Sequence, residues 1–405
     1  MTPPWKTAKL VELCEQPQYG FTASADFDAN GPRFLRITDL KGGSPDWTTV
    51  PRCQCPPDEI GKYRLHDGDV VIARIGATTG RTAFIKNPPE AVFASYLIRL
   101  RAKPGLDPEF FFFCTCSEHF VSFIDRHKDG NLKGGVNASI LAEAPIPLPA
   151  LAEQRAIAAL LAEVQAAVET ETERLRVARE LKQAALAEVF TRGLRGEGTG
   201  AERESWPVVS LGSLAKIGNG STPRRSDHRY WSGGKIPWLT SGKIHEGVIY
   251  AADQFVTELA VRECHLPRVP AGSLLVAITG QGKTLGNVAK TEIETCISQH
   301  LAYITLTESA HPDFFRYFLS SRYDDLRAAA HGMGSTKGAL TCAFLKSFMV
   351  PCPNPDEQRD VAALFRGIDV RIARHEARQK LLRELFASLL RDLMTGRRRV
   401  VEVTP

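Results

Sequence analysis

Residues 149–193, PALAEQRAIAALLAEVQAAVETETERLRVARELKQAALAEVFTRG, decide the fold, because a second version of this stretch follows 204 positions later (353 − 149 = 204). The second version, PNPDEQRDVAALFRGIDVRIARHEARQKLLRELFASLLRDLMTG at 353–396, also opens with proline and Glu-Gln-Arg. Both stretches then carry apolar residues at helical spacing without a further proline inside the pattern. The chain therefore consists of two tandem copies of one unit, each ending in a long helix.

The repeat extends well beyond the helices. Residues 130–160 share twelve identities with residues 334–364 over thirty-one positions. At the same offset, DPEFF at 107–111 matches HPDFF at 311–315. We therefore expect four segments in chain order, which are a globular part at 1–150, a helical spacer at 151–196, a second globular part at 197–352 and a second spacer at 353–400.

Each globular part has the pattern of an α+β fold. Short runs rich in β-branched and aromatic residues are separated by Gly, Pro and Asp, as in DVVIARIG at 69–76 and SLLVAITG at 273–280. Aromatic-rich segments that begin at Pro108 and Pro312 predict helices packed on these strands. The expected architecture is a mixed or antiparallel sheet with helices and irregular loops.

The long helices predict a coiled coil. Each has roughly 40 residues, or about 60 Å at 1.5 Å per residue, and so long an apolar stripe needs another long helix as its partner. We expect the two helices to pair antiparallel, with the globular parts at opposite ends about an approximate two-fold axis. We interpret the Glu-Gln-Arg starts as capping the helices and docking the globular parts. The predicted pairing residues are Ile157, Leu161, Val164, Val168 and Leu175 in the first helix and Ile368, Ile372, Leu382, Leu385 and Leu389 in the second.

The composition indicates an ordinary soluble protein. With 405 residues, 43% of them hydrophobic and 24% charged, the chain can bury more than one core. Its amino terminus lacks the apolar run of a secretion signal, and no later segment approaches the roughly 20 apolar residues that span a bilayer. We therefore expect a cytoplasmic protein without a membrane partner.

The cysteines and the net charge are less informative. Nine cysteines without the spacing of a zinc site predict buried free thiols. The formal net charge of +5 is compatible with a nucleic-acid partner, although it locates no basic patch.

Several short motifs together resemble those of a known family. The motifs are IPLPALAEQRAI (146–157) with its copy VPCPNPDEQRDV (350–361), the opening Trp206-x4-Leu211-Gly212, GNGSTP (218–223), and the helix ends FTRG (190–193) and LMTG (393–396). With them the whole chain resembles the specificity (S) subunit of Type I restriction-modification systems. The first copy departs from the pattern, since it opens Trp5-Lys6 without a Leu-Gly.

The resemblance implies two target-recognition domains, each reading one half of a bipartite asymmetric site in double-stranded DNA. It implies that the helices set the spacing of the half-sites and recruit two methyltransferase (M) subunits and, in the full complex, restriction (R) subunits. The chain itself would be non-catalytic and would bind no cofactor, because S-adenosylmethionine, ATP and Mg²⁺ would belong to the partner subunits. The residues themselves present no paired carboxylates or nucleophile and base pattern that would indicate catalysis.

Two enzyme-like motifs offer alternatives. Residues 277–284, AITGQGKT, resemble a phosphate-binding loop with alanine in place of the first glycine, but the residues that follow are a poor start for a helix. We favour a glycine-containing loop between two strands. Asn87-Pro88-Pro89-Glu90 resembles the Asn-Pro-Pro-aromatic motif of adenine methyltransferases, with Glu90 in place of the aromatic residue, and we interpret it as a proline loop.

DNA recognition needs cations for phosphates and forked polar side chains for base edges. The candidates lie mostly on loops at equivalent positions of the two copies. They are Arg36, Arg74, Thr78, Thr79, Arg81, Lys133 and Asn137 in the first copy and Arg224, Arg225, Gln281, Lys283, Thr284 and Lys337 in the second.

The copies agree at Lys133 and Lys337, which suits a shared phosphate contact. They differ at Arg74 against Ile278 and at Asn137 against Thr341, which suits the reading of different bases. For each residue, a solvated surface charge or polar group is the alternative. For the chain, the alternative is a coiled-coil scaffold that binds only protein partners.

Overall fold

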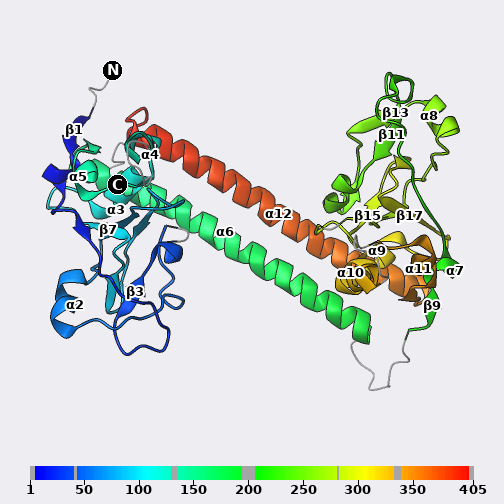
Figure 1. Cartoon of the computed structure of the whole chain (residues 1–405), viewed down its shortest axis with the longest axis horizontal. Coiled ribbons are helices and arrows are strands. Elements are labelled where there is room, and N and C mark those ends of the chain that lie inside the picture. Colours follow the sequence, from blue (N-terminus) through cyan, green and yellow to red (C-terminus); the bar gives the residue numbers. More distant parts are fainter. Residues whose placement is uncertain are drawn as a thin grey trace, which may run out of the picture. The chain divides into compact units, whose positions relative to one another are not determined.

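The computed structural model describes residues 5–40, 43–128, 135–193, 206–280, 282–332 and 339–400 (Figure 1). Two compact units make up the chain. Unit 1 is Met1–Arg174 with His375–Pro405, and unit 2 is Leu175–Arg374. Each unit therefore contains one globular part and a half of each long helix.

Unit 1 is built on a four-stranded antiparallel sheet in the order β2-β7-β4-β5. Two strand pairs stand beside it, antiparallel β1–β8 and parallel β3–β6. The strands are β1 (Lys6–Lys9), β2 (Gln18–Tyr19), β3 (Arg33–Leu35), β4 (Val70–Ala73), β5 (Thr82–Phe84), β6 (Ala91–Phe93), β7 (Leu97–Leu100) and β8 (Pro145–Leu148). The short helices are α1 (Leu10–Leu13), η1 (Ile37–Asp39), α2 (Pro57–Tyr63), α3 (Pro108–Cys116), α4 (Glu118–Lys128) and α5 (Ala138–Ala142).

Unit 2 has a five-stranded sheet in the order β10-β17-β14-β15-β12, with the smaller groups β13-β11-β16 and β18-β9. The strands are β9 (Val208–Ser210), β10 (Ala215–Asn219), β11 (Ile236–Leu239), β12 (Val248–Ile249), β13 (Gln254–Val256), β14 (Leu274–Ala277), β15 (Val288–Thr291), β16 (Cys296–Ile297), β17 (Leu301–Leu306) and β18 (Met349–Pro351). The short helices are α7 (Leu211–Leu214), η2 (His228–Tyr230), η3 (Ser241–Glu246), α8 (Glu258–Glu263), α9 (Pro312–Ser321), α10 (Tyr323–Gly332) and α11 (Cys342–Ser347).

The two globular parts repeat the same topology. Strand β14 begins and ends 204 positions after β4, and α9 begins 204 positions after α3. The parallel pair β3–β6 recurs as the parallel pair β11–β16. The predicted α+β class and the tandem duplication are therefore confirmed.

Strand β4 shows why the sequence of the central strands is apolar throughout. Val70 and Ile72 face the phenylalanines of α3, whereas Val71 and Ala73 face a second core that contains Leu35. All four residues of the strand are buried, because both faces of the sheet are covered. The strand therefore reads as a continuous apolar run and not as an alternating one.

The glutamine of each Glu-Gln-Arg motif attaches a globular part to its long helix. Gln154 is 1% exposed, and its Oε1 accepts a hydrogen bond from the backbone N–H of Asp107, which precedes α3, at 2.8 Å. Its Nε2 donates to the carbonyl of Pro149 at 2.9 Å. Gln358 makes the equivalent bonds to His311 and Pro353 in unit 2. The glutamine thus docks the globular part, as interpreted from the sequence.

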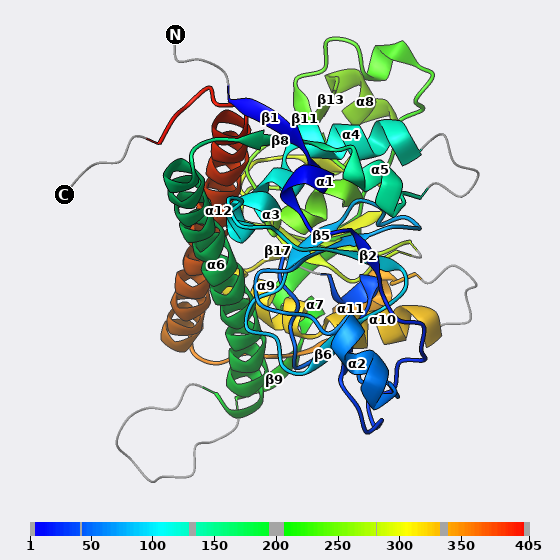
Figure 2. The same ribbon diagram turned by 90° about the vertical axis from the view of Figure 1, so that its left-hand side faces the viewer.

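The long helices α6 (Leu151–Arg192) and α12 (Pro355–Met394) lie side by side in both views (Figures 1 and 2). In unit 1, Arg399, just beyond the end of α12, donates hydrogen bonds of 2.5 and 2.8 Å to Glu153 near the start of α6. In unit 2, Phe190 near the end of α6 stacks on Phe365 near the start of α12, with ring centroids 6.0 Å apart. The predicted antiparallel pairing of the helices is confirmed.

The predicted seam residues differ in burial. Ile157, Leu161 and Leu175 are buried, and six more are partly buried, namely Val164, Val168, Ile368, Ile372, Leu382 and Leu389. Leu385 is a correction, since its side chain is 46% exposed. The adjacent Phe386 packs on the core of unit 1 instead, and one residue turns an α-helix by about 100°. Among the described helices, none is both long enough and apolar enough to cross a membrane.

Candidate nucleic-acid interface

In unit 1, residues 74–81 form the loop between β4 and β5. Gly76 and Gly80 adopt positive φ angles of 80° and 89°, which favour glycine and turn the chain back into β5. The Arg74 guanidinium lies 4.8 Å from the centre of the Tyr19 ring, which holds it at the surface. Arg81 is exposed, whereas Thr78 and Thr79 are half-buried. The loop therefore presents one stacked and one exposed arginine.

Two other candidates of unit 1 have structural partners. Arg36 forms two hydrogen bonds to Asp39, from Nε at 3.0 Å and Nη2 at 2.9 Å, and this pairing raises the pKa of Arg36. Asn137 caps α5, because its Oδ1 accepts a hydrogen bond from the N–H of Ile140 at 2.8 Å. Thr341 caps α11 in the same way. Asn137 and Thr341 thus differ in identity, but both cap the helix that follows them.

In unit 2, the equivalent loop joins β14 to β15. Helix α10 fixes its backbone, since the Tyr323 hydroxyl donates to the carbonyl of Lys283 at 2.7 Å and Arg327 donates to the carbonyl of Gly282 at 2.8 Å. The side chain of Lys283 is exposed and that of Thr284 is half-buried. Ile278, which stands where unit 1 has Arg74, is buried in the core. The loop thus presents a lysine on a fixed backbone.

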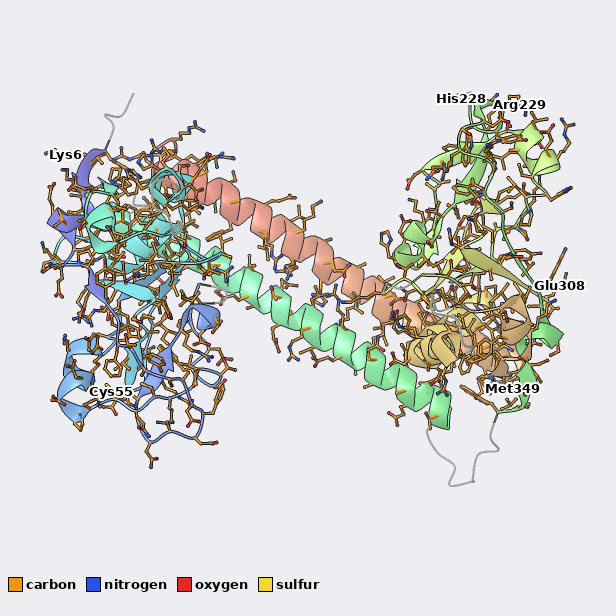
Figure 3. The ribbon with its side chains drawn as sticks, in the orientation of Figure 1. Lys6, Cys55, His228, Arg229, Glu308 and Met349 are labelled. Carbon is orange, nitrogen blue, oxygen red and sulfur yellow. The ribbon has the colours of Figure 1, made fainter. Side chains whose placement is uncertain are left out.

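A second basic surface of unit 2 lies at the end that carries β11, β13 and α8, where Figure 3 labels His228 and Arg229. The Arg225 guanidinium lies 4.1 Å from the ring centre of Trp231 and 4.8 Å from that of Trp238. It also donates a hydrogen bond of 2.7 Å to Gln254. Arg224 is exposed beside it, and its carbonyl accepts a bond from Trp231.

Three sequence candidates, Lys133, Lys337 and Gln281, lie outside the described residues. The residues that position the loops escaped the sequence analysis. Tyr19, Tyr323, Arg327, Trp231 and Trp238 each hold a candidate loop or arginine in place. Tyr19, Tyr323 and Arg327 lie far along the chain from the loops that they contact, so only folding brings them together, whereas Trp231 and Trp238 closely follow Arg225 in the sequence.

The enzyme-like motifs are structural. The segment 277–284 leads from β14 into the antiparallel strand β15, so no helix follows whose N-terminus would bind a phosphate. In the proline loop, the backbone N–H of Asn87 donates to Asp67 at 2.7 Å and Glu90 pairs with Arg64. Among the described residues, no three His, Cys, Asp or Glu side chains are grouped to hold a metal ion.

Comparison with known proteins identifies the family. The model of the Type I restriction modification DNA specificity domain matches residues 3–179 and again residues 203–383. The chain belongs to this family. Its two matched segments correspond to the two copies of the tandem repeat, and each contains one of the loops described above.

Two relatives support this assignment, one of them along nearly its full length. A protein described as the specificity subunit of the type I restriction enzyme MjaX, from Methanocaldococcus jannaschii, is 26% identical over 414 residues, covering 98% of this chain and 94% of its own. The EcoR124I/EcoR124II specificity subunit of Escherichia coli is 24% identical over 162 residues, 40% of each chain.

Two solved structures share the fold. The S subunit of a type I restriction-modification system from M. genitalium has a TM-score of 0.65 and 16% identity, covering 97% of this chain and 96% of its own. A chain from a structure of type I restriction-modification complex assembly has a TM-score of 0.57 and 20% identity, covering 98% and 99%.

Membership in the family fixes the general role of the chain. As a specificity subunit it determines which DNA target a type I restriction-modification complex recognises, and it binds DNA as part of a complex with M and R subunits. It is non-catalytic and binds no cofactor, because S-adenosylmethionine and ATP belong to the M and R subunits. The polar and basic loops described above are therefore candidates for DNA contact and not for chemistry.

Proposed function

We propose that the globular part of each unit reads one half of a bipartite asymmetric site in double-stranded DNA, and that α6 and α12 set the distance between the halves. One observation carries this proposal. The loops β4–β5 and β14–β15 occupy the same place in a duplicated fold but carry different side chains, with Thr79 in one where the exposed Lys283 stands in the other. Equal scaffolds with unequal loops suit the reading of two different half-sites.

Within this proposal the candidate residues divide by their environment. In unit 1, Arg74, Thr78, Thr79, Arg81 and Asn137 would face DNA from the loop and from the start of α5. In unit 2, Arg224, Lys283 and Thr284 would do so. Arg36 and Arg225 are held by Asp39 and by the two tryptophans, so they would support neighbouring contacts. Lys133, Lys337 and Gln281 complete the set as candidates from the sequence.

The first prediction tests the reading of DNA. Deleting the gene for this chain from its host, with the M subunit left in place, should abolish methylation at one bipartite asymmetric motif, which genome-wide mapping of methylated adenines detects. Complementation with the intact chain should restore that motif, and an empty vector is the control. An unchanged methylome would favour a scaffold that binds only proteins.

The helices carry a second duplicated feature, on their exposed faces. Residues 174–181, RLRVAREL, match residues 378–385, RQKLLREL. Val177 and Leu181 are 48% and 60% exposed, and the equivalent Leu381 and Leu385 are 64% and 46% exposed. Each unit thus presents one exposed apolar pair at i and i+4 on a helix, the spacing that places two side chains on one face.

Charge surrounds both apolar pairs in the same way. Glu180 pairs with Arg176 at 2.6 Å on its own helix, and the equivalent Glu384 approaches Lys380 at 4.0 Å. Arg179 and its equivalent Arg383 add a further cation to each copy. Basic side chains therefore flank each apolar pair.

We propose that these two motifs are the docking sites of two M subunits, one on each motif. Similar surfaces at equivalent positions suit two copies of one partner. Phosphates need only cations, so the exposed apolar pair favours a protein helix over DNA. The fitting partner segment is an amphipathic helix with acidic residues beside its apolar stripe.

The second prediction tests these docking sites. Leu181→Asp or Leu385→Asp should each reduce the M subunits bound per chain from two to one, and the double variant should bind none, as measured by native mass spectrometry of co-expressed complexes. The melting temperature of the free chain should stay unchanged, because both side chains are exposed. Val370→Asp is the matched control, since Val370 is 61% exposed on α12 but its equivalent is Ala166. Two M subunits on either single variant would contradict the proposal.

A further inference from the structure

The middle of the helix pair contains a buried polar contact between equivalent residues of the repeat. Glu171 is 1% exposed, and its Oε2 accepts a hydrogen bond of 2.8 Å from Nδ1 of His375, 204 positions later. Arg174 and Arg378, also equivalent to each other, approach Glu171 at 2.8 and 3.5 Å. The hydrogen bond from His375, together with these arginines, lowers the pKa of Glu171. Two antiparallel helices bring equivalent positions face to face only at their midpoint. At this midpoint the two copies of the repeat differ, with glutamate in one and histidine in the other.

In unit 1, an aromatic contact docks the globular part onto the helix pair. The ring of Phe113, on α3, lies 6.1 Å from the ring of Phe386 on α12. Gln165 of α6 and Phe112 of α3 line the same cavity as Phe386. None of these four side chains is charged, and the contact between Phe113 and Phe386 is apolar.

In unit 2, the equivalent positions form a polar network. Lys182, which corresponds to Phe386, pairs with Asp369, which corresponds to Gln165, at 2.5 Å. Tyr317, which corresponds to Phe113, donates a hydrogen bond of 2.6 Å to Asp369. Burial, together with that bond, raises the pKa of the Tyr317 hydroxyl, so the tyrosine remains a donor. Arg316 lies 3.6 Å from the same carboxylate.

Pairing α6 with the α6 of a second chain would break these contacts. Glu171 would face another Glu171. Neither carboxylate could donate the hydrogen bond that His375 donates in the native pair, although each would keep its own Arg174. Lys182 of the second chain would replace Phe386 against Phe113 and put an ammonium group on an apolar surface.

Pairing α12 with another α12 would also lose contacts. Phe386 of the second chain would take the place of Lys182, so Asp369 would meet an aromatic ring in place of its ion-pair partner. His375 would face another His375, which two neutral imidazoles tolerate. Pairing α6 with a second α6 is therefore less favourable than pairing α12 with a second α12.

We propose that these differences between the copies form a pairing code, by which α6 selects α12 and rejects a second copy of itself. The code consists of Glu171 with His375 at the midpoint, Phe386 with Phe113 in unit 1, and Lys182 with Asp369 in unit 2. It acts by mismatch in the wrong pairs as much as by attraction in the right one. This inference rests on the proposed function. The code keeps the two different reading parts of one chain paired with each other, so that the subunit recognises an asymmetric site.

The third prediction tests the code, first in the intact chain at pH 8. His375→Glu should lower the melting temperature because it places two carboxylates in contact. The exchanged double variant Glu171→His/His375→Glu should recover at least half of that loss. Glu180→His, which repeats the Glu171→His change at a 64% exposed side chain, is the control and should have little effect. No recovery in the double variant would overturn the midpoint part of the code.

A second measurement tests partner choice directly. A protease site inserted within 194–205 allows the folded chain to be cut into its two halves, and mixing cut chains of different isotopic mass lets the halves exchange. Native mass spectrometry should find first halves bound to second halves, with pairs of first halves at least roughly tenfold below the statistical quarter. The variant Glu171→His/Lys182→Phe should raise pairs of first halves toward that quarter.

Statistical mixing of the wild-type halves would overturn the proposal. So would a variant whose first halves still avoid one another. Neither measurement involves DNA, so failure of the pairing code is distinguishable from failure of the proposed DNA reading.

Discussion

Replacing Phe190 by alanine should lower the free energy of unfolding of unit 2 by about 3–5 kcal/mol, the usual cost of removing a buried phenylalanine ring. Phe190 is 8% exposed, and its ring centroid lies 5.5 Å from that of Phe314, 5.4 Å from Phe318 and 6.0 Å from Phe365. The substitution would leave a cavity where α6, α9 and α12 meet. Differential scanning calorimetry should show a melting temperature lower by roughly 10 °C.

Two further variants interpret that result. Phe190→Met introduces the residue found at the equivalent position, Met394 in unit 1, and should recover part of the loss because it refills much of the volume. Leu364→Ala removes a 42% exposed side chain from the same unit and should cost less than about 1 kcal/mol. A Phe190→Ala effect as small as that of Leu364→Ala would show that the aromatic cluster does not stabilise the unit.

Lengthening both long helices should change the spacing of the DNA site without changing its half-site sequences. Four residues inserted after Thr172 in α6 and four inserted after Arg374 in α12 add about 6 Å to each helix, or at most about two base pairs of 3.4 Å. Because Glu171 faces His375, the two insertions face each other and preserve the register on either side. Mapping of methylated adenines should find the original half-sites separated by one or two additional base pairs.

Insertion into α6 alone is the matched control for the spacing experiment. It shifts the register of one side, so either Lys182 loses Asp369 or Glu171 loses His375, and the chain should melt at a lower temperature. The idea that the helices act as a spacer fails if the doubly extended chain keeps the original spacing or reads new half-sites.

The sequence predicted the fold well because the same sequence pattern occurs in both copies of the repeat. The shared offset of 204 residues, the apolar runs of β4 and β14, and the proline starts of α3 and α9 all depend on local patterns that survive in both copies. The sequence was less accurate at Leu385, since periodicity alone did not distinguish it from the adjacent Phe386, which packs on the core.

The candidate interface was less predictable than the fold. The sequence located the two glycine-containing loops, but it did not reveal that Arg36 is paired with Asp39 or that Arg225 lies against two tryptophan rings. Whether a charged side chain is available to DNA depends on such neighbours. Asp39 and Trp231 lie only three and six residues after Arg36 and Arg225, but the folded conformation decides that these side chains turn toward each other.

The sequence by itself determined that this protein has two copies of one unit and two long helices, because periodicity and repetition are properties of the chain. Its motifs also indicated the family. Only the tertiary structure decided what differs between the copies. Glu171 and His375 are ordinary helix residues until antiparallel packing brings them within 2.8 Å, and Lys182 and Asp369 become partners only across the same seam. Contacts between distant residues depend on register, and register exists only in the folded chain.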